Sequence, residues 1–304
     1  MTEQLLSGKV ALITGAGSGL GRAHADHLAS LGASVVVNDL GAAAAQAAKE
    51  IADQFGVATA SYDGDIGSID GRQALVDTAL EAFGRLDIVV NNAGIVRDKM
   101  IFSMDEAAWD DVIRVHGKGT FAVCRAASAY FRTRSKSGDE SPASIVNTAS
   151  EAGLFGNVGQ ANYTFAKGGI VALSLTVHQE MQKYGVRCNV VCPRARTAML
   201  ANLALPEAEQ GAADPLDPAH VAPLVAFLAS ERSAPISGQV FVAYGGKVQH
   251  VRPPSWGEAL VVRDRQIEFS DIEQFAHELF SQESPVPVVP RHQSSISTWS
   301  QGGF

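Results

Sequence analysis

Short runs of consecutive apolar and β-branched residues recur along the chain and are separated by longer segments with helical periodicity. Runs such as DIVVN are apolar throughout, as is typical of parallel strands that are buried on both faces. We predict strands at Val10–Thr14, Ser34–Asn38, Val57–Tyr62, Leu86–Asn91, Ser144–Thr148, Arg187–Val191 and Gln239–Val242. Helices are predicted after the first strand and at Ile69–Phe83, Glu106–Phe131, Ala161–Gln182 and Pro218–Ala229.

This alternation predicts the α/β class, with one doubly wound Rossmann-type parallel sheet that carries helices on both faces. We assign residues 1–246 to this domain. Residues 247–304 form a C-terminal extension, expected to pack on the body or on a partner subunit. Within the extension, Ser270-Asp271-Ile272-Glu273 is a capping-box pattern and predicts one helix.

Two segments interrupt the alternation. Residues 132–142, RTRSKSGDESP, are polar and mixed in charge, which predicts a solvated surface loop; a phosphate contact by its basic residues is the alternative. Residues 197–217 are apolar at first and then small, acidic and broken by proline. A segment of this length without strong packing signals predicts a mobile lid.

Composition narrows the classes of function. The net charge of −8 provides no general attraction to nucleic acid or to an anionic membrane. No apolar run approaches the ~20 residues of a membrane span, and the N-terminus lacks the features of a signal peptide. Cys124, Cys188 and Cys192 form no Cys-x-x-Cys pair, so we expect buried thiols in a reducing cytoplasm and no metal site.

A glycine-rich turn follows the first strand directly and precedes a helical run. Such glycines allow a tight turn and let backbone N–H groups and a helix N-terminus approach a pyrophosphate. Its position between strand and helix makes it a strong signal for a dinucleotide. The residues assigned to the coenzyme here are Gly15, Gly17, Ser18, Gly19, Leu20 and Gly21.

Asp39 stands at the end of the second strand, where a carboxylate would accept hydrogen bonds from the adenosine ribose. It would repel a 2′-phosphate, so the sequence favours NAD over NADP. A helix cap or turn aspartate is the alternative. After the third strand, Asp65 and Ile66 are assigned to adenine, with helix capping as the alternative role of Asp65.

Asn91-Asn92-Ala93-Gly94 follows the fourth strand. Its small residues suit close backbone packing beside the coenzyme, so Asn92, Ala93 and Gly94 are assigned to that site. A structural role is favoured for Asn91.

Tyr163 and Lys167 are four residues apart, which places them on one face of a helix. A nearby ammonium favours the phenolate, so the lysine is expected to lower the pKa of the tyrosine. Ser150, at the end of the fifth strand, would polarise the reacting oxygen. A surface lysine and a packing tyrosine at chance spacing are the alternative.

The turn TGAGSGLG, the tetrapeptide NNAG, and Ser150 with Tyr163-x-x-x-Lys167 together resemble the short-chain dehydrogenase/reductase family, from about Leu6 to Gly246. The resemblance implies that Tyr163 is the acid/base, that Lys167 also holds the nicotinamide ribose, and that Ser150 orients the substrate. It also implies a homo-oligomer, a tetramer or dimer, built through the tyrosine helix.

The sequence departs from the family pattern at two places. His116 stands where the family has an asparagine that holds a proton-relaying water, and histidine could replace it through its backbone or its ring. The usual Pro-Gly after the sixth strand is replaced by Pro193-Arg194. Pro193 and Thr197 are still assigned to the coenzyme. Arg194 and Arg196 would attract an acidic substrate or are ordinary loop arginines.

The stretches VVVNDLG, the VHxxG pattern and FGNVGQANYTFAK resemble more narrowly the (R)-3-hydroxyacyl-CoA dehydrogenase domain of peroxisomal multifunctional enzymes, which also acts on 17β-hydroxysteroids. This resemblance implies an NAD-dependent alcohol dehydrogenase whose small-molecule substrate is a hydroxyacyl-CoA or a hydroxysteroid. Two alternatives stay open. One is an NADPH-using oxoacyl reductase of the same fold, and the other is a catalytically silent dinucleotide-binding protein.

Overall fold

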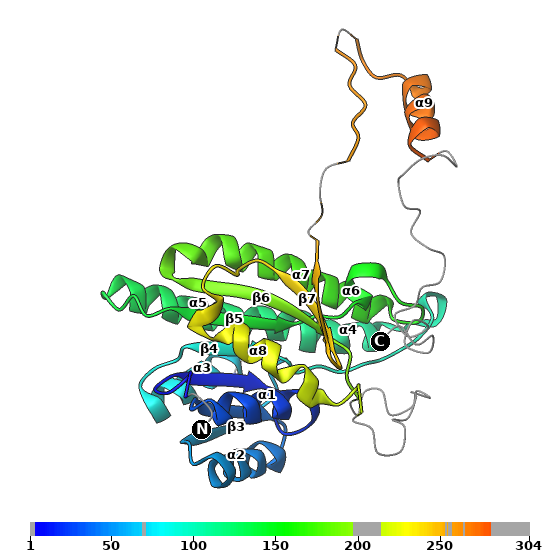
Figure 1. The fold of residues 1–304 in the computed structure, drawn as a ribbon. Coiled ribbons are helices and arrows are strands. Elements are labelled where there is room, and N and C mark those ends of the chain that lie inside the picture. The colour runs from blue at the N-terminus through cyan, green and yellow to red at the C-terminus, as the bar shows by residue number, and fades with distance from the viewer. Residues whose placement is uncertain are drawn as a thin grey trace. The chain divides into compact units, whose positions relative to one another are not determined.

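The computed structural model describes residues 4–68, 71–196, 214–252, 254, 257–263 and 265–280. The chain divides after Val251 into two compact units (Figure 1). The first unit contains the sheet and the helices packed on it. The second unit, Arg252–Gly303, contains helix α9 (Phe269–Phe280).

The first unit is built on an eight-stranded sheet with the order β3-β2-β1-β4-β5-β6-β7-β8. The neighbours from β3 to β7 are parallel, and β8 is antiparallel to β7. Chain order reverses on either side of β1, where Leu12 is level with Val36 of β2 and Val89 of β4. The strands are β1 (Val10–Thr14), β2 (Ser34–Asp39), β3 (Thr59–Asp63), β4 (Ile88–Asn91), β5 (Ala143–Thr148), β6 (Val186–Pro193), β7 (Val240–Tyr244) and β8 (Lys247–Val251).

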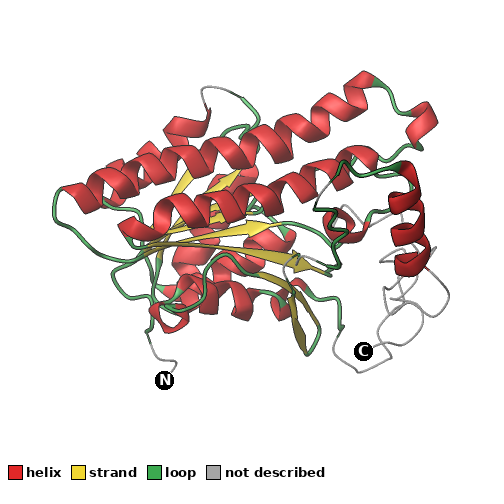
Figure 2. Cartoon of the chain, turned by 90° about the horizontal axis from the view of Figure 1, so that it is seen from above, coloured by secondary structure: helices red, strands yellow, loops and turns green. Residues whose placement is uncertain are grey.

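Helices cover both faces of this sheet, which confirms the predicted doubly wound α/β fold (Figure 2). One core joins α1 (Gly19–Ser30), α2 (Ala42–Phe55) and α8 (Ala222–Ala229) to one face. The other core joins α3 (Gly71–Phe83), α5 (Thr120–Lys136) and α7 (Ala161–Met181) to the opposite face. Two shorter helices, α4 (Glu106–Val112) and α6 (Ala152–Phe155), lie beside α7.

Alternate residues of one strand enter different cores. In β1, Ala11 and Ile13 belong to the first core, whereas Val10 and Leu12 belong to the second. Full burial of such a side chain contributes about 1.5–3 kcal/mol, so apolar side chains are favoured on both faces of the central strands. This requirement explains the continuous apolar runs in the sequence.

The predicted loop at 132–142 is wrong over its first half. Helix α5 continues to Lys136, and the side chain of Arg134 is only 7% exposed. Its guanidinium donates to the carbonyl oxygens of Leu86 (2.8 Å) and Ser141 (2.5 Å) and to the carboxylate of Asp87 (3.2 Å). The charge run indicated solvent exposure because these partners lie elsewhere in the chain.

Two further elements differ from the prediction. Strand β8 was not predicted, and its polar side chains are mostly exposed, as expected for an edge strand. The single predicted helix at 106–131 contains a π-helical segment, Ile113–Gly119, between α4 and α5. Because π-helical turns are often found at functional sites, this segment is a candidate part of the site.

In the second unit, α9 begins at Phe269, one residue before the predicted N-cap Ser270. The carboxylate of Asp271 accepts a hydrogen bond from the backbone N–H of Glu268 (2.9 Å) and pairs with Arg265 (2.6 Å). The helix is therefore capped from within its first turn, and the predicted capping box is placed too late in the sequence.

Candidate active site

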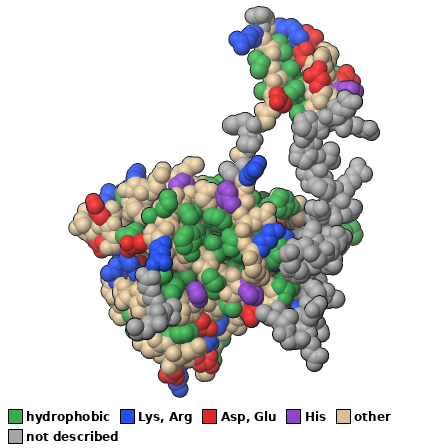
Figure 3. All heavy atoms as spheres, viewed as in Figure 1, with side chains coloured by type: hydrophobic (Ala, Val, Ile, Leu, Met, Phe, Trp, Pro, Cys, Tyr) green, Lys and Arg blue, Asp and Glu red, His purple; other side chains and the backbone are tan. Residues whose placement is uncertain are grey.

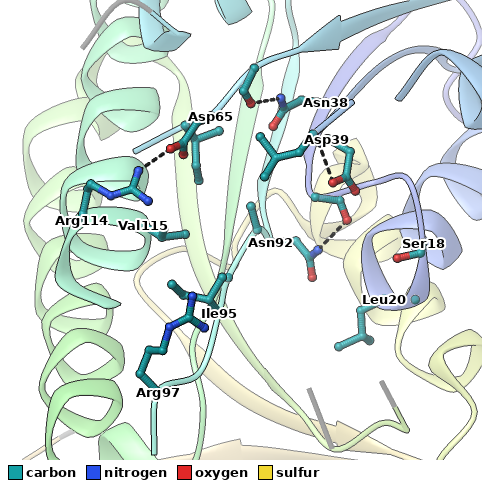
Figure 4. Close-up of a pocket in the computed structure, with 17 residues that line it drawn as sticks. Ser18, Leu20, Asn38, Asp39, Asp65, Asn92, Ile95, Arg97, Arg114 and Val115 are labelled. Atoms are coloured by element: carbon teal, nitrogen blue, oxygen red, sulfur yellow. Dashed lines mark hydrogen bonds and ion pairs between the residues drawn. The ribbon is translucent and has the colours of Figure 1, made fainter. Parts of the chain in front are cut away.

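A cavity of about 390 Å³ lies at the carboxyl ends of β1, β2 and β4, where the strand order reverses (Figure 4). Ligands of open α/β sheets bind at such a switch point. Most of the residues predicted to hold the coenzyme line this cavity. They are Gly15, Ser18, Gly19, Leu20, Asp39, Asp65, Ile66, Asn92, Ala93 and Gly94.

The glycine turn is packed too tightly for side chains. Gly15 has a φ of +63°, and a Cβ there would lie 2.8 Å from the Cα of Ala93. A Cβ on Gly21 would lie 2.0 Å from the carbonyl oxygen of Gly15. Gly17 and Gly21 therefore do not line the cavity but shape the turn through close packing on neighbouring protein atoms. The side chain of Ser18 makes no capping hydrogen bond to α1, so the first N–H groups of this helix are left to a ligand.

Asp39 is held in place by backbone groups. Its carboxylate accepts hydrogen bonds from the N–H groups of Gly17 and Leu40, each at 2.8 Å. The N-cap of α2 is Gly41, so Asp39 does not cap that helix. The carboxylate lies on the cavity wall beside the glycine turn, where a ribose could reach it (Figure 4).

Asp65 lies across the cavity from Asp39. One of its carboxylate oxygens accepts from the N–H of Gly67 (2.7 Å), and the other pairs with Arg114 of the π-helical segment (Figure 4). Ile66 is buried beneath this turn. Two bound donors leave further lone pairs on the Asp65 carboxylate, which can still accept a hydrogen bond from a purine amine.

The two asparagines after β4 have different partners. Asn91 is buried and donates to the side-chain oxygen of Asn147 of β5 (2.8 Å), which fits a structural role. The side chain of Asn92 donates to the carbonyl oxygens of Thr14 and Gly15, both at 3.2 Å. Asn92 thus connects the end of β4 to the glycine turn.

Several residues of the cavity wall were not predicted. They are Asn38, Leu40, Gly64, Ile95, Arg97, Arg114 and Val115. Arg114 and Val115 immediately precede His116, so the π-helical segment contributes to both the cavity and the reacting groups. From this RVHG stretch only His116 was predicted, on the basis of its departure from the family pattern. No feature of Arg114 or Val115 in the sequence indicated that they line the cavity.

The structure brings Ser150, Tyr163 and Lys167 together. Ser150 follows β5, and its hydroxyl lies near enough to the phenol of Tyr163 to act on the pKa of that phenol. Lys167 lies one turn after Tyr163 in α7, with its Nζ 5.5 Å from the centre of the phenol ring. The same Nζ donates to the carbonyl oxygen of Thr148 at the end of β5 (2.7 Å). The lysine is therefore fixed between the strand and the tyrosine.

Burial sets the acidity of both groups. Tyr163 is half-buried, yet its hydroxyl is enclosed, and this burial raises its pKa to about 12 although the Ser150 hydrogen bond acts in the opposite direction. Burial also lowers the pKa of Lys167 to about 8. The pKa of Tyr163 is therefore raised in this structure, because the loss of hydration outweighs the contact with Ser150, and its lowering by Lys167 stays a prediction.

The ring of His116, rather than only its backbone, lies against the ring of Tyr163. The two rings meet edge to face with centroids 5.3 Å apart. His116 Nε2 lies 2.8 Å from the carbonyl oxygen and 3.1 Å from the backbone nitrogen of Ile95. Its Nδ1 is buried without a hydrogen-bond partner among the described residues, and burial lowers the pKa of His116 to about 3. The imidazole is therefore neutral at physiological pH.

The His116 ring leaves no room for a side chain at position 94, because a Cβ on Gly94 would lie 2.2 Å from His116 Cε1. Pro193, at the end of β6, is paired with Ala243 of β7. Thr197, the predicted contact to the carboxamide, lies outside the described residues, as does the predicted lid up to residue 213.

Both arginines after β6 are ion-paired within the chain. Arg194 is paired with Glu151 at 2.6 Å and Arg196 with Asp214 at 2.9 Å. Their charges are therefore balanced locally, which favours the interpretation of these two residues as ordinary loop arginines. Among the described residues, no group of three or more His, Cys, Asp or Glu side chains could hold a metal ion. Nor does the described part contain a helix that is long and apolar enough to cross a membrane.

Comparison with known proteins shows which proteins this chain resembles. The family model of the short chain dehydrogenases matches residues 9–207. The hydroxyacyl-CoA dehydrogenase ChsB1 of Mycobacterium tuberculosis is 50% identical over 259 residues, which cover 82% of this chain and 81% of that protein. The mouse peroxisomal multifunctional enzyme type 2 is 40% identical over 270 residues, which cover 85% of this chain but only 34% of the mouse protein.

A solved structure agrees with the sequence relatives. The crystal structure of a short chain dehydrogenase from Mycobacterium avium matches with a TM-score of 0.83 and 38% identity. The match covers 93% of this chain and 99% of that chain.

Proposed function

Because the chain belongs to the short-chain dehydrogenase family and is therefore an oxidoreductase, we propose that it interconverts a secondary alcohol and a ketone with NAD as its coenzyme. The observation that carries this proposal is the meeting of three groups beside the cavity. The Ser150 hydroxyl acts on the phenol of Tyr163, and the ammonium of Lys167 lies over its ring. The ring of His116 contacts Tyr163, and His116 directly follows the cavity-lining Arg114 and Val115, so this proton donor and acceptor lies next to the proposed dinucleotide site.

The cavity fits a nicotinamide dinucleotide, and its preference is assigned to Asp39. Gly15, Gly17 and Gly21 let the turn pack closely on its neighbours, and the N-terminus of α1 is available to a pyrophosphate. The Asp39 carboxylate, anchored by two backbone N–H groups, accepts from ribose hydroxyls and repels a 2′-phosphate. When bound, the nicotinamide supplies the acceptor or donor of the hydride.

The chain's own residues handle the proton. Ser150 orients the alcohol oxygen, and Tyr163 removes its proton during oxidation or returns it during reduction. Burial keeps the pKa of Tyr163 near 12 in the structure described, so the positive charge of an oxidised coenzyme must add to that of Lys167 to favour the phenolate. We assign the onward transfer of this proton to Lys167, and His116 beside Tyr163 keeps an unused hydrogen-bonding position at Nδ1 among the described residues.

For the substrate we propose a 3-hydroxyacyl-CoA. ChsB1 is named a hydroxyacyl-CoA dehydrogenase and is 50% identical over most of both chains, which supports this class over a hydroxysteroid. The mouse relative corresponds to this chain over only about a third of its length, so its activity supports the class less directly. An NADPH-using reductase of the same fold is opposed by Asp39.

The test is the absorbance of reduced nicotinamide with purified protein. NAD and NADP are each supplied with (R)- and (S)-3-hydroxyacyl-CoAs of several lengths and with 17β-hydroxysteroids. NAD-dependent turnover of one hydroxyacyl-CoA enantiomer is expected. Preferred use of NADP would reject the role of Asp39, and turnover of steroids alone would reject the substrate class. NAD binding without any turnover would favour a silent dinucleotide-binding protein.

We also propose a homo-oligomer in a reducing compartment such as the cytoplasm. Phe121 of α5 and Phe165 of α7 are 51% and 61% exposed, which is unusual for a monomer surface. Apolar side chains also gather on the face seen in Figure 3. Sedimentation of monomer alone at micromolar protein would reject the oligomer.

Cys124, Cys188 and Cys192 are unpaired and buried, which supports a reducing compartment. The packing of residues 247–304 on the body or a partner stays a prediction.

A further inference from the structure

A largely buried ion pair lies immediately beside Ser150. Arg194 Nε and Nη2 contact the two carboxylate oxygens of Glu151 at 2.6 and 2.7 Å, in the parallel two-bond geometry of an arginine–carboxylate pair. The two side chains are only 13% and 12% exposed. The guanidinium also lies over the ring of Tyr244, 4.4 Å from its centre.

Packing alone does not account for this pair. Removing two charges from water is costly, and well-packed apolar residues in the same positions are often neutral or stabilising. Elsewhere in the first unit, the end of β6 and the face of α7 are joined by apolar side chains such as Val190, Cys192 and Ile170. The pair therefore points to a geometric requirement that apolar side chains do not meet, namely a fixed direction and distance between the turn that carries Ser150 and the end of β6.

The pair joins three segments around the serine. Glu151 follows Ser150 and begins the four-residue helix α6, where its carbonyl oxygen accepts from the N–H of Phe155 (2.9 Å). Arg194 follows the last residue of β6, and its backbone N–H donates to Ala243 of β7 (3.0 Å). The guanidinium of Arg194 thus connects the turn that carries Ser150 to the end of β6, and the backbone of Arg194 connects the end of β6 to β7.

We propose that Arg194 and Glu151 are positioning residues that hold the Ser150 hydroxyl at the phenol of Tyr163. A helix as short as α6 cannot hold the turn by its own hydrogen bonds, because so few of them form. The Ser150 hydroxyl is otherwise held only locally, by the N–H of Ala152 at 3.2 Å. The inference rests on the proposed function, because it assigns Ser150 a role in orienting the alcohol.

The test is a double-mutant cycle with Ser150→Ala on the full-length protein, assayed with NAD and the preferred hydroxyacyl-CoA. Arg194→Met should lower kcat about 10- to 100-fold, the range expected when a reacting group is misplaced by about 1 Å. In the Ser150→Ala background the same change should lower kcat less than about 3-fold further, because the group that it positions is already absent. The Kd for NAD should stay within about 2-fold of wild type.

Two further variants separate positioning from folding. Glu151→Gln keeps the shape of the side chain, and Arg194→Lys keeps the charge but loses the two-bond geometry, so both should lose less kcat than Arg194→Met. Equal losses of kcat from Arg194→Met in the presence and absence of Ser150 would overturn the proposal. An Arg194→Met variant with wild-type kcat would also overturn it.

A readout without substrate keeps the proposal testable if no turnover is found, an outcome that would count against the proposed function alone. Amide hydrogen exchange of the peptide spanning residues 150–156 should rise about 10-fold in Arg194→Met, and less in Glu151→Gln. Exchange of the peptide covering β1 should stay unchanged in both variants. Unchanged protection at 150–156 in Arg194→Met would overturn the inference whatever the kinetics show.

Discussion

Buried polar side chains at the two ends of the parallel sheet differ in their hydrogen bonding. At the amino end of β4, the carboxylate of Asp87 is 1% exposed and accepts from the backbone N–H of Val10 (2.9 Å), from Arg85 (2.8 and 2.9 Å) and from Arg134 (3.2 Å). Both carboxylate oxygens of Asp87 thus have protein donors, although Nε of its partner Arg134 is buried without a hydrogen-bond partner among the described residues. At the carboxyl end, His116 keeps an unpartnered Nδ1, and Lys167 makes one described hydrogen bond, to a carbonyl oxygen.

The difference separates structure from chemistry. A satisfied carboxylate such as Asp87 fixes the sheet and has nothing left to offer a ligand. The enclosed Tyr163, Lys167 and His116 have pKa values moved by burial to about 12, 8 and 3, and they keep capacity to donate or accept. Perturbed groups of this kind gather where proton transfer takes place.

The largest expected effect is at the carboxyl end. Tyr163→Phe should lower kcat by about 10²- to 10⁴-fold, because it removes the group that transfers the proton. The Kd for NAD, measured by fluorescence, should stay within about 2-fold of wild type. Tyr184→Phe makes the same chemical change at the far end of α7 and should leave kcat unaltered. Full activity in Tyr163→Phe would reject the mechanism.

At the amino end the expected loss is in stability. Asp87→Ala leaves Arg134 largely buried without its carboxylate, so the free energy of unfolding should fall by about 3–5 kcal/mol. Urea denaturation provides the measurement, and turnover below the unfolding range should remain near wild type. The exposed Asp53 is the matched control, and Asp53→Ala should change stability by less than about 0.5 kcal/mol. If Asp87→Ala lost activity but not stability, the contrast between the two ends would be wrong.

Acidic pH should lower the free energy of unfolding of the first unit through two buried histidines. Burial lowers the pKa of His24 and of His116 to about 3, below about 6.5 in the unfolded chain. The unfolded state binds these protons first, so the stability is complete above pH 6.5 and is lost as the pH falls toward 3. At pH 5 the loss should be about 2 kcal/mol per histidine. In denaturation at pH 7 and 5, His24→Leu should remove its own share, and an unchanged pH dependence would contradict this assignment.

The smallest expected effect concerns coenzyme choice. Asp39→Asn keeps the shape and an acceptor oxygen for Gly17 but removes the charge that repels a 2′-phosphate. The ratio of kcat/KM for NAD over NADP should fall about 10-fold or more, which corresponds to ~1.4 kcal/mol. Measuring both coenzymes with one substrate gives the ratio directly. An unaltered ratio would remove Asp39 from the specificity determinants.

The fold was largely predictable because burial on both faces leaves a clear signal. Apolar runs located β1 and β2 to within one residue, and the glycine turn indicated the cavity before any geometry was known. Strand β8 escaped prediction because an exposed edge strand carries no such apolar signal. Arg134 was misplaced in a loop because Asp87, its partner, lies 47 residues away.

The sequence by itself determined the fold class, the glycine turn, and the spacing of Tyr163 and Lys167 on one helical face, since these features are local. Only the tertiary structure decided how acidic those groups are, because a pKa depends on the loss of hydration and on neighbours brought in from other elements. It also decided that Arg114 joins the cavity and that Arg194 is paired with Glu151. Such contacts join positions far apart in the chain, so neither residue alone indicates its partner.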